Sequence, residues 1–277
     1  MSLVSLCFGL LLLAAGVLAA DAGETYIKVK IESPEAVAKV GKLVSIDHGA
    51  GPGNWVAYAN DAQLQALTEA GYGYEVLPHP GTLYEPTMAF TAKDAQAWDS
   101  YPTYAAYQQM MTDFATNYPS LCVLDTIGTS VLGRQLLMLK ISDNPTVEEA
   151  EPEVLYTSSI HGDELAGFVL MLRLVDSLLT TYGTDSRVTN IVNGMELYVN
   201  PLANPDGTYH SGDHTVFGAQ RYNQNGVDLN RNYPDPEDGQ NPDGNPWQAE
   251  TLAFMAFAEA NNISLSMNFH GGAEVVN

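Results

Sequence analysis

The stretch that decides the fold is residues 154–182, VLYTSSIHGDELAGFVLMLRLVDSLLTTY. Its first five residues predict a strand and residues 164–182 predict a long apolar helix, and a strand that runs into a helix is the unit of an α/β sheet. Between the strand and the helix lies His161, three residues before Glu164. Ligands of α/β sheets gather beyond the carboxyl ends of strands, and residues three apart on a helical turn share one face. The pair could therefore bind one metal ion, although an acidic residue in a first helical turn is common without any ligand.

A second predicted strand, residues 263–269, ends at His270. Gly271 and Gly272 follow it, so the chain can turn closely around a ligand. Two strand ends of one sheet would bring two imidazoles and one carboxylate to the same edge. Three protein ligands leave a fourth tetrahedral position open to water, which is typical of catalytic rather than structural zinc. Taken alone, His270 could equally be a plain strand end.

The elements around these two strands indicate two domains. From residue 101 onward, strands at 136–141 and 195–200 alternate with helices, which predicts a mixed, mostly parallel sheet flanked by helices. Residues 24–78 predict the order strand, helix, strand, strand, helix, strand, which is the ferredoxin-like α+β arrangement. Residues 79–100 contain Pro80, Gly81, Pro86 and several polar residues with no sustained period, and they predict a linker between this small domain and the domain at 101–277.

The charge of the chain excludes several partners. With 33 acidic residues against 11 Lys and Arg, the net charge is -22, which would repel a nucleic-acid backbone and an anionic membrane surface. We therefore expect a monomer with no nucleic-acid partner and no stable membrane association.

Residues 1–20 predict a secretory signal peptide, although no Lys or Arg precedes the apolar run. The alternative is a membrane anchor, for which the run is short. We expect a secreted protein, either extracellular or periplasmic. Because Cys7 lies inside the signal, Cys122 would remain the only cysteine, and its apolar neighbours indicate a buried residue without a disulfide.

Two of the five arginines fall close together, Arg221 and Arg231, and the second lies within the polar segment 226–234, GVDLNRNYP. The planar guanidinium matches a carboxylate or an oxyanion. The alternative is a pair of arginines that only offsets nearby acidic residues. A further turn-rich run, Asn204-Pro-Asp-Gly207, follows the strand at 195–200.

The four motifs HGDE (161–164), NPDG (204–207), GVDLNRNYP (226–234) and FHGG (269–272) resemble, in order and rough spacing, those of the zinc carboxypeptidases, relatives of carboxypeptidases A and B. The resemblance covers about residues 100–277. It implies that Zn²⁺ is bound by His161, Glu164 and His270, and that Asp228 orients the first histidine ligand. The domain at 24–78 resembles, by predicted topology, the propeptide that covers the active site of this family.

The resemblance also implies a reaction, hydrolysis of the C-terminal peptide bond of peptides or proteins. In it, Arg221 would polarise the scissile carbonyl and stabilise the oxyanion, while Asn230 and Arg231 would bind the free C-terminal carboxylate of the substrate. The bottom-up chemistry agrees, since bound zinc activates water and arginines stabilise anions.

One part of the family pattern is missing from the sequence. The resemblance implies a general-base glutamate well downstream of His270, and the sequence ends at Asn277. We therefore expect a complete zinc site within an incomplete catalytic domain that exposes apolar surface. The sequence leaves open whether such a domain is active by itself. Two alternatives are a non-catalytic zinc-containing protein that binds peptide C-termini and a calcium-binding secreted surface protein. The second rests on the oxygen-rich residues 235–244, which do not fit the EF-hand spacing and favour a solvated loop.

Overall fold

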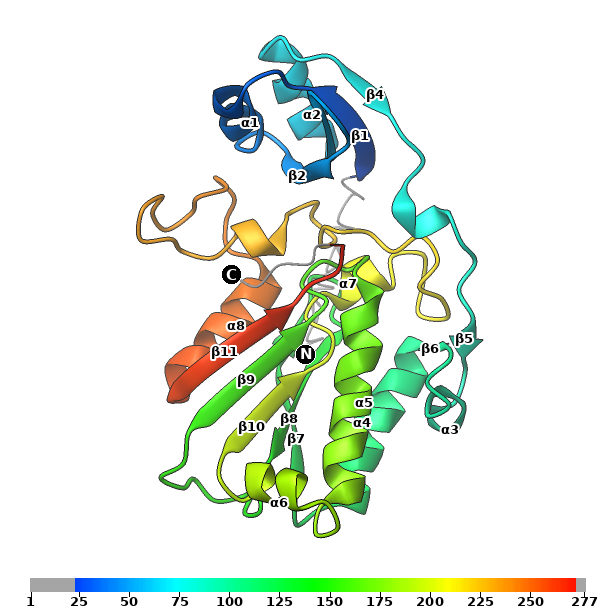
Figure 1. The fold of residues 1–277 in the computed structure, drawn as a ribbon, viewed down its shortest axis with the longest axis vertical. Helices are drawn as coiled ribbons and strands as arrows, with labels where there is room; N and C mark the ends of the chain where they lie inside the picture. Colours follow the sequence, from blue (N-terminus) through cyan, green and yellow to red (C-terminus); the bar gives the residue numbers. More distant parts are fainter. Residues whose placement is uncertain (1–22, 273–277) are drawn as a thin grey trace, which may run out of the picture.

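The computed structural model describes residues 23–272, in which a small unit lies over one end of a larger one (Figure 1). The predicted signal peptide lies outside the described residues. The small unit has its elements in the predicted order: β1 (Thr25–Lys30), α1 (Pro34–Val40), β2 (Ser45–Gly49), β3 (Asn54–Ala59), α2 (Asp61–Glu69) and β4 (Tyr74–Val76). Its sheet has the order β2-β3-β1-β4, and every neighbouring pair is antiparallel. Ile27, Val29 and Leu67 are fully buried in its core.

The segment expected to be a linker contains short elements. These are the 3-10 helix η1 (Pro80–Thr82), β5 (Met88–Ala89) and α3 (Ala92–Ala95), and β5 pairs in parallel with β6 (Tyr101–Pro102). The small side chains of Ala89, Ala92 and Ala95 are buried in the core of the larger unit. The second half of the segment therefore packs as part of the larger unit.

The larger unit is built on a five-stranded sheet with helices on both faces. Its elements are α4 (Tyr104–Asn117), β7 (Cys122–Thr129), β8 (Gln135–Ile141), β9 (Glu153–Ser158), α5 (Leu165–Thr181), α6 (Ser186–Val192), β10 (Glu196–Asn200), α7 (Pro205–Thr208), η2 (Leu229–Arg231), α8 (Ala249–Ala260) and β11 (Ile263–Phe269). The strand order is β11-β9-β10-β8-β7.

The sheet is mixed, as predicted, but the expectation that it is mostly parallel is wrong. Strand β9 is parallel to both β10 and β11, whereas β8 is antiparallel to both β10 and β7. The reason is the short connection at residues 130–134, which joins β7 directly to β8. A parallel pair needs a crossover of a dozen or more residues, so such a short turn forces an antiparallel pair.

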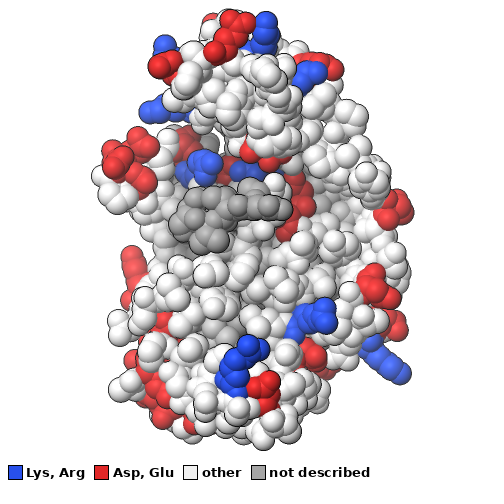
Figure 2. Space-filling model, in the orientation of Figure 1, with Lys and Arg blue, Asp and Glu red and all other residues white. Residues whose placement is uncertain are grey.

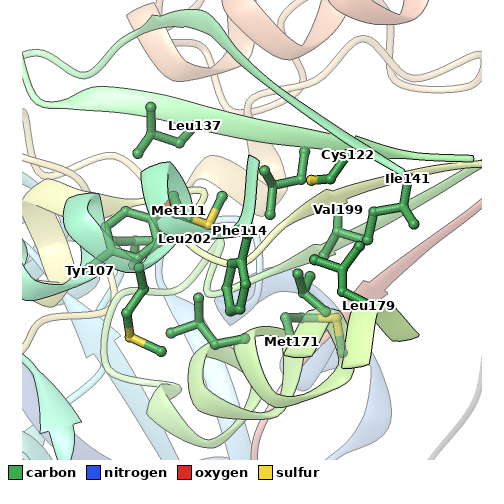
Figure 3. Packing of buried hydrophobic residues seen from close by; sticks show 14 of the residues in the cluster. Tyr107, Met111, Phe114, Cys122, Leu137, Ile141, Met171, Leu179, Val199 and Leu202 are labelled. Carbon is green, nitrogen blue, oxygen red and sulfur yellow. The ribbon is translucent and has the colours of Figure 1, made fainter. Parts of the chain in front are cut away.

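Successive side chains of β8 enter different cores, as the alternation of a strand requires. Leu137 and Leu139 belong to the larger core, together with side chains of α4 and α5, and Figure 3 shows Leu137 in that cluster. Met138 lies in a second cluster on the opposite face, together with Phe254 of α8. Cys122 is buried and free, as predicted, and burial raises the pKa of its thiol to about 12.

Strand β11 lies at the edge of the sheet, where Leu265 and Met267 are exposed by 54% and 40%. Figure 2 shows acidic side chains in scattered groups on the face drawn, with several Lys and Arg side chains among them. Within residues 23–272, no single helix has both the length and the apolar composition needed to cross a membrane. The helices α5 and α6 together have that length and composition, and they are bent by 104° relative to each other.

Candidate metal centre

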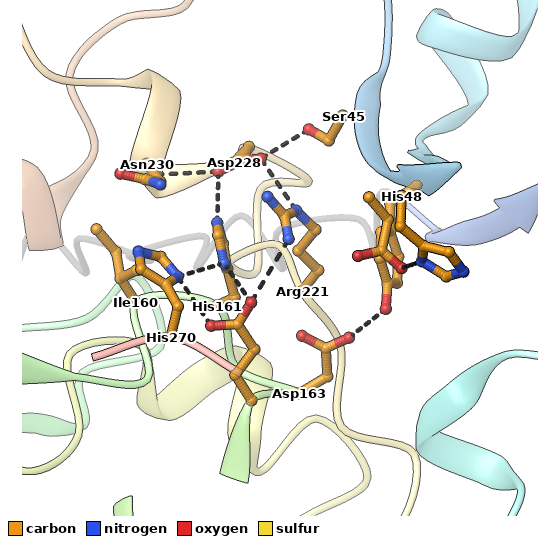
Figure 4. A network of polar contacts seen from close by, with 12 residues as sticks. Ser45, His48, Ile160, His161, Asp163, Arg221, Asp228, Asn230 and His270 are labelled. Carbon is orange, nitrogen blue, oxygen red and sulfur yellow. Dashed lines mark hydrogen bonds and ion pairs between the residues drawn. The ribbon is translucent and has the colours of Figure 1, made fainter. Parts of the chain in front are cut away.

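Two neighbouring parallel strands deliver the predicted ligands to one place. Phe269 at the end of β11 pairs with Ser158 at the end of β9, and His270 and His161 follow these strands. The His161 Nδ1 atom lies 2.9 Å from Oε1 of Glu164 and 3.1 Å from Nδ1 of His270. The second carboxylate oxygen of Glu164 lies 2.9 Å from Nδ1 of His270. The structure thus brings all three predicted ligands together (Figure 4).

The chemistry of these atoms fits a cation. The three ligand atoms lie within 4.8 Å of one another, and Nε2 of His161 lies 3.2 Å from Oδ1 of Asp228. When Nε2 donates its hydrogen to Asp228, the neutral imidazole keeps a lone pair on Nδ1, which faces the site. Two imidazole nitrogens and one glutamate are a ligand set typical of catalytic zinc.

The electrostatics of Glu164 also favour metal binding. Burial alone would raise its pKa, but the adjacent rings of His161 and His270 outweigh burial and lower the pKa to about 2. The carboxylate therefore stays ionised at neutral pH. Glu164 immediately precedes α5, which begins at Leu165, and the Ser159 hydroxyl donates to the Glu164 carbonyl. The loop and the start of the helix together hold this side chain in place.

Arg221 and Asp228 form a buried ion pair beside the ligands. The Nε of Arg221 donates to Oδ2 of Asp228 at 3.1 Å, and its Nη1 lies 3.8 Å from Oε1 of Glu164. Burial alone would raise the pKa of Asp228, but Arg221 and His161 outweigh burial and lower it far below the ordinary value. Burial opposes the charge of Arg221, yet Asp228 and the other nearby carboxylates raise its pKa above the usual one. Both groups are therefore charged at neutral pH.

Asn230 and Arg231 lie on η2, one turn beyond Asp228. The backbone N–H of Asn230 donates to Oδ1 of Asp228, which ties η2 to the ligand His161. Both residues line a cavity of about 480 Å³ that also includes Asp228 and Ser45. The structure therefore places them next to Asp228, on the wall of a cavity whose lining does not include His161, Glu164 or His270.

Sequence reasoning missed the residues that reach this centre from the small unit. Ser45 of β2 donates to Oδ2 of Asp228 at 2.7 Å, and Tyr58 of β3 donates to Oδ2 of Asp163 at 2.7 Å. Burial and the nearby Glu24 raise the pKa of Asp163 to about 6. The Glu24 carboxylate accepts from the backbone N–H groups of Arg221 and Tyr222. The partners are 105 to 198 residues apart in the sequence, so no local pattern could reveal them.

In the oxygen-rich loop at 235–244, the first carboxylate, that of Asp235, forms hydrogen bonds within the loop itself. Oδ1 of Asp235 accepts from the backbone N–H groups of Glu237 and Asp238, which is the geometry of a turn. Among residues 23–272, the groups of acidic and histidine side chains close enough to hold a metal ion are the site above and a cluster of Asp143, Glu149 and Glu151.

Comparisons with known proteins identify the family to which this chain belongs. The model of the family described as zinc carboxypeptidase matches residues 107–277. Carboxypeptidase D of Rattus norvegicus is 42% identical over 167 residues, which cover 59% of this chain and 12% of that protein. Carboxypeptidase M of Mus musculus is 36% identical over 171 residues, which cover 61% of this chain and 38% of that protein. The chain thus spans between about an eighth and two fifths of the curated relatives named here.

Solved structures support the fold. Carboxypeptidase A from Helicoverpa armigera superposes with a TM-score of 0.63 at 19% identity, over 92% of this chain and 71% of that one. Thrombin activatable fibrinolysis inhibitor superposes with a TM-score of 0.61 at 16% identity, over 90% of this chain and 72% of that one. Since the family model matches more than half of the sequence, the chain belongs to the zinc carboxypeptidase family.

Proposed function

We propose that this protein hydrolyses the C-terminal peptide bond of peptides or proteins, with Zn²⁺ bound by His161, Glu164 and His270. The observation that carries the proposal is the convergence of these three side chains at the adjoining ends of β9 and β11. Bound zinc would supply Lewis acidity and activate water. The neighbouring relatives are named carboxypeptidases, which supports the reaction class.

The other side chains of the site have matching roles in this proposal. Asp228 holds a proton at Nε2 of His161 and keeps Nδ1 free to bind the metal. The Asp228 carboxylate also holds Arg221 in place through a hydrogen bond. The Nη1 atom of Arg221 lies near Glu164, so the guanidinium would stabilise an oxyanion formed beside the zinc. Asn230 and Arg231, on the wall of the cavity, would bind the free carboxylate of the substrate.

The proposal predicts that a peptide with a free C-terminus is cleaved about 10- to 100-fold faster than the same peptide with an amidated C-terminus. Hydrogen bonds to a charged group contribute about 1.5–3 kcal/mol, and amidation removes that charge. The measurement is release of the last amino acid by the full-length protein, whose zinc content is determined in parallel. Equal cleavage of both peptides would contradict the carboxylate grip, and tight binding without cleavage would favour the non-catalytic binder.

We further propose that residues 24–78 form a ferredoxin-like propeptide domain and that the protein is a zymogen. Four contacts support this role. Besides the bonds from Ser45 and Tyr58, Glu24 caps the backbone of Arg221, and Asn60 donates to the Gly226 carbonyl. The small unit thereby lies over the ends of β9 and β11 (Figure 1), where a substrate would need to enter. Secretion as a monomer after removal of residues 1–20 completes the proposal.

The Tyr58→Phe variant is expected to weaken the docking of the small unit by about 1–3 kcal/mol, because a buried carboxylate oxygen of Asp163 loses its donor. Faster proteolysis of the segment around Tyr84, which is 83% exposed, would report this loosening. The Tyr74→Phe variant is the matched control, since Tyr74 is partly exposed on β4. Identical proteolysis of wild type and Tyr58→Phe would contradict a docking role for Tyr58.

A further inference from the structure

The motif Asn204-Pro-Asp-Gly207 has no part in the proposed chemistry, yet Asn204 is fully buried next to the site. We propose that Asn204 is a positioning residue, whose side-chain amide fixes the metal ligand His161 relative to Arg221. This inference rests on the proposed function, because it assigns the residue to the same zinc site. It follows from the contacts of one amide group with three different loops.

The side-chain nitrogen of Asn204 lies between two backbone carbonyls. Nδ2 donates to the carbonyl of Ile160, the residue before His161, at 3.3 Å. It also donates to the carbonyl of Arg221 itself, again at 3.3 Å. An amide NH₂ group has two hydrogens, so it can donate a hydrogen bond to both carbonyls at once. A single side chain thus joins the backbone that carries the first ligand to the backbone that carries the cation.

The oxygen of the same amide forms a different hydrogen bond. Oδ1 of Asn204 accepts from the backbone N–H of Gly207 at 2.9 Å and so caps the short helix α7. The backbone around this side chain therefore offers two acceptor carbonyls and one donor N–H, and the asparagine amide forms a hydrogen bond with each of them. A serine would keep the cap but lose the bridge, since Ser is also a good N-cap residue. The capping role and the bridging role can therefore be separated by substitution.

The backbone around Asn204 leaves little room for another side chain to replace the bridge. A Cβ atom on Gly162 would lie 2.4 Å from the backbone of Gly207 and Thr208, and 2.5 Å from the carbonyl oxygen of Gln220. The three loops therefore meet through backbone atoms, with direct bonds such as that from the Gly162 N–H to the Arg221 carbonyl at 3.2 Å. Two side chains add to these backbone contacts: the Thr208 hydroxyl donates to the Gly162 carbonyl at 2.8 Å, and the Asn204 amide alone bonds to both the Ile160 and the Arg221 carbonyls.

The loop that Asn204 joins is also strained. Ser159 has a φ of 53°, which is in the left-handed region that non-glycine residues rarely adopt. The backbone N–H of Asn204 donates to the Ser159 carbonyl at 3.0 Å. Such a conformation persists when its surroundings over-determine it. Ser159 lies two residues before His161. Asn204 constrains this loop through its backbone bond to Ser159 and its side-chain bond to Ile160.

The test compares Asn204→Ser with Asn200→Ser in the full-length protein. Asn200 is also fully buried, and its amide donates to the Leu137 carbonyl at 2.8 Å, with no bond to the His161 or Arg221 loops. Both variants lose a buried amide, so both lower the melting temperature of the metal-free protein. We expect Asn204→Ser alone to reduce zinc affinity by about tenfold, the lower end of the effect of partners that orient metal ligands. Competition with a chromophoric chelator measures the affinity.

A second readout needs no enzyme activity. The visible absorption of the Co²⁺-substituted protein reports ligand geometry, and we expect it to change in Asn204→Ser and not in Asn200→Ser. If Asn204→Ser does not fold, Asn204→Asp, which keeps the cap and the side-chain shape, is compared in the same way. Wild-type affinity and an unchanged spectrum in a folded variant would overturn the inference alone. Wild-type protein that binds no zinc would overturn the proposed function and the inference with it.

Discussion

Replacing His270 with alanine is expected to lower the zinc affinity by roughly 10²- to 10⁴-fold. Apparent binding free energies of protein zinc sites are about 10–16 kcal/mol, so one of three protein ligands accounts for roughly 3–5 kcal/mol. The loss should be severe here because the Nδ1 atom of His270 lies within 3.1 Å of His161 and 2.9 Å of Glu164, with no other described histidine in that group. Zinc content of the purified protein should fall from near one per chain to near zero.

The matched control for this variant is His48→Ala. His48 is also an exposed imidazole, and it contacts Asp47 in the small unit rather than the ligands. A chelator should lower the melting temperature of wild type and His48→Ala, because zinc at 100 times its dissociation constant stabilises a protein by about 2.7 kcal/mol. It should leave the melting temperature of His270→Ala unchanged. A His270→Ala protein with wild-type zinc affinity would show that another group completes the site.

The two histidines of the candidate zinc site could be singled out from the sequence because each follows a strand pattern. His270 stands directly after a predicted strand and His161 stands three residues after the end of another, and the ends of parallel neighbouring strands lie at one edge of a sheet. The structure places those strands side by side as β9 and β11. The apolar pattern of the strands did not reveal that β7 and β8 are antiparallel, because their relative direction follows from the short connection at residues 130–134 and not from their composition.

The contacts between the two units were outside the reach of sequence reasoning. Ser45 lies in an ordinary strand of the small unit, and its bond to Asp228 spans 183 residues. The role of Asp228 was suggested only by the family resemblance, because a single carboxylate in a polar segment has no signal of its own. The arrangement of Asn204 is similar, since the NPDG run predicts a turn but not the two carbonyls that its amide joins.

Asp228→Ala is the variant expected to damage both stability and metal binding. Its carboxylate accepts from Arg221, His161 and Ser45, all of which are buried. Breaking a buried ion pair by removing one partner costs about 3–5 kcal/mol, because the remaining charge stays buried without compensation. Loss of the partner that orients a metal-binding histidine lowers metal affinity by about 10- to 100-fold. Both effects are therefore expected together, as a lower free energy of unfolding in denaturant and weaker zinc binding.

Glu196→Ala separates these two effects. The Glu196 carboxylate is also fully buried and lies 2.8 Å from Nζ of Lys140, but it starts β10, at the opposite end of the strand from the site. This variant should lose stability through the same loss of a buried partner and keep its zinc affinity. If Asp228→Ala instead lost stability alone, Asp228 would serve only to neutralise Arg221. A loss of zinc affinity seen in Asp228→Ala and absent from Glu196→Ala would mean that the carboxylate supports the metal site, which it reaches directly at His161 and through Arg221 at Glu164.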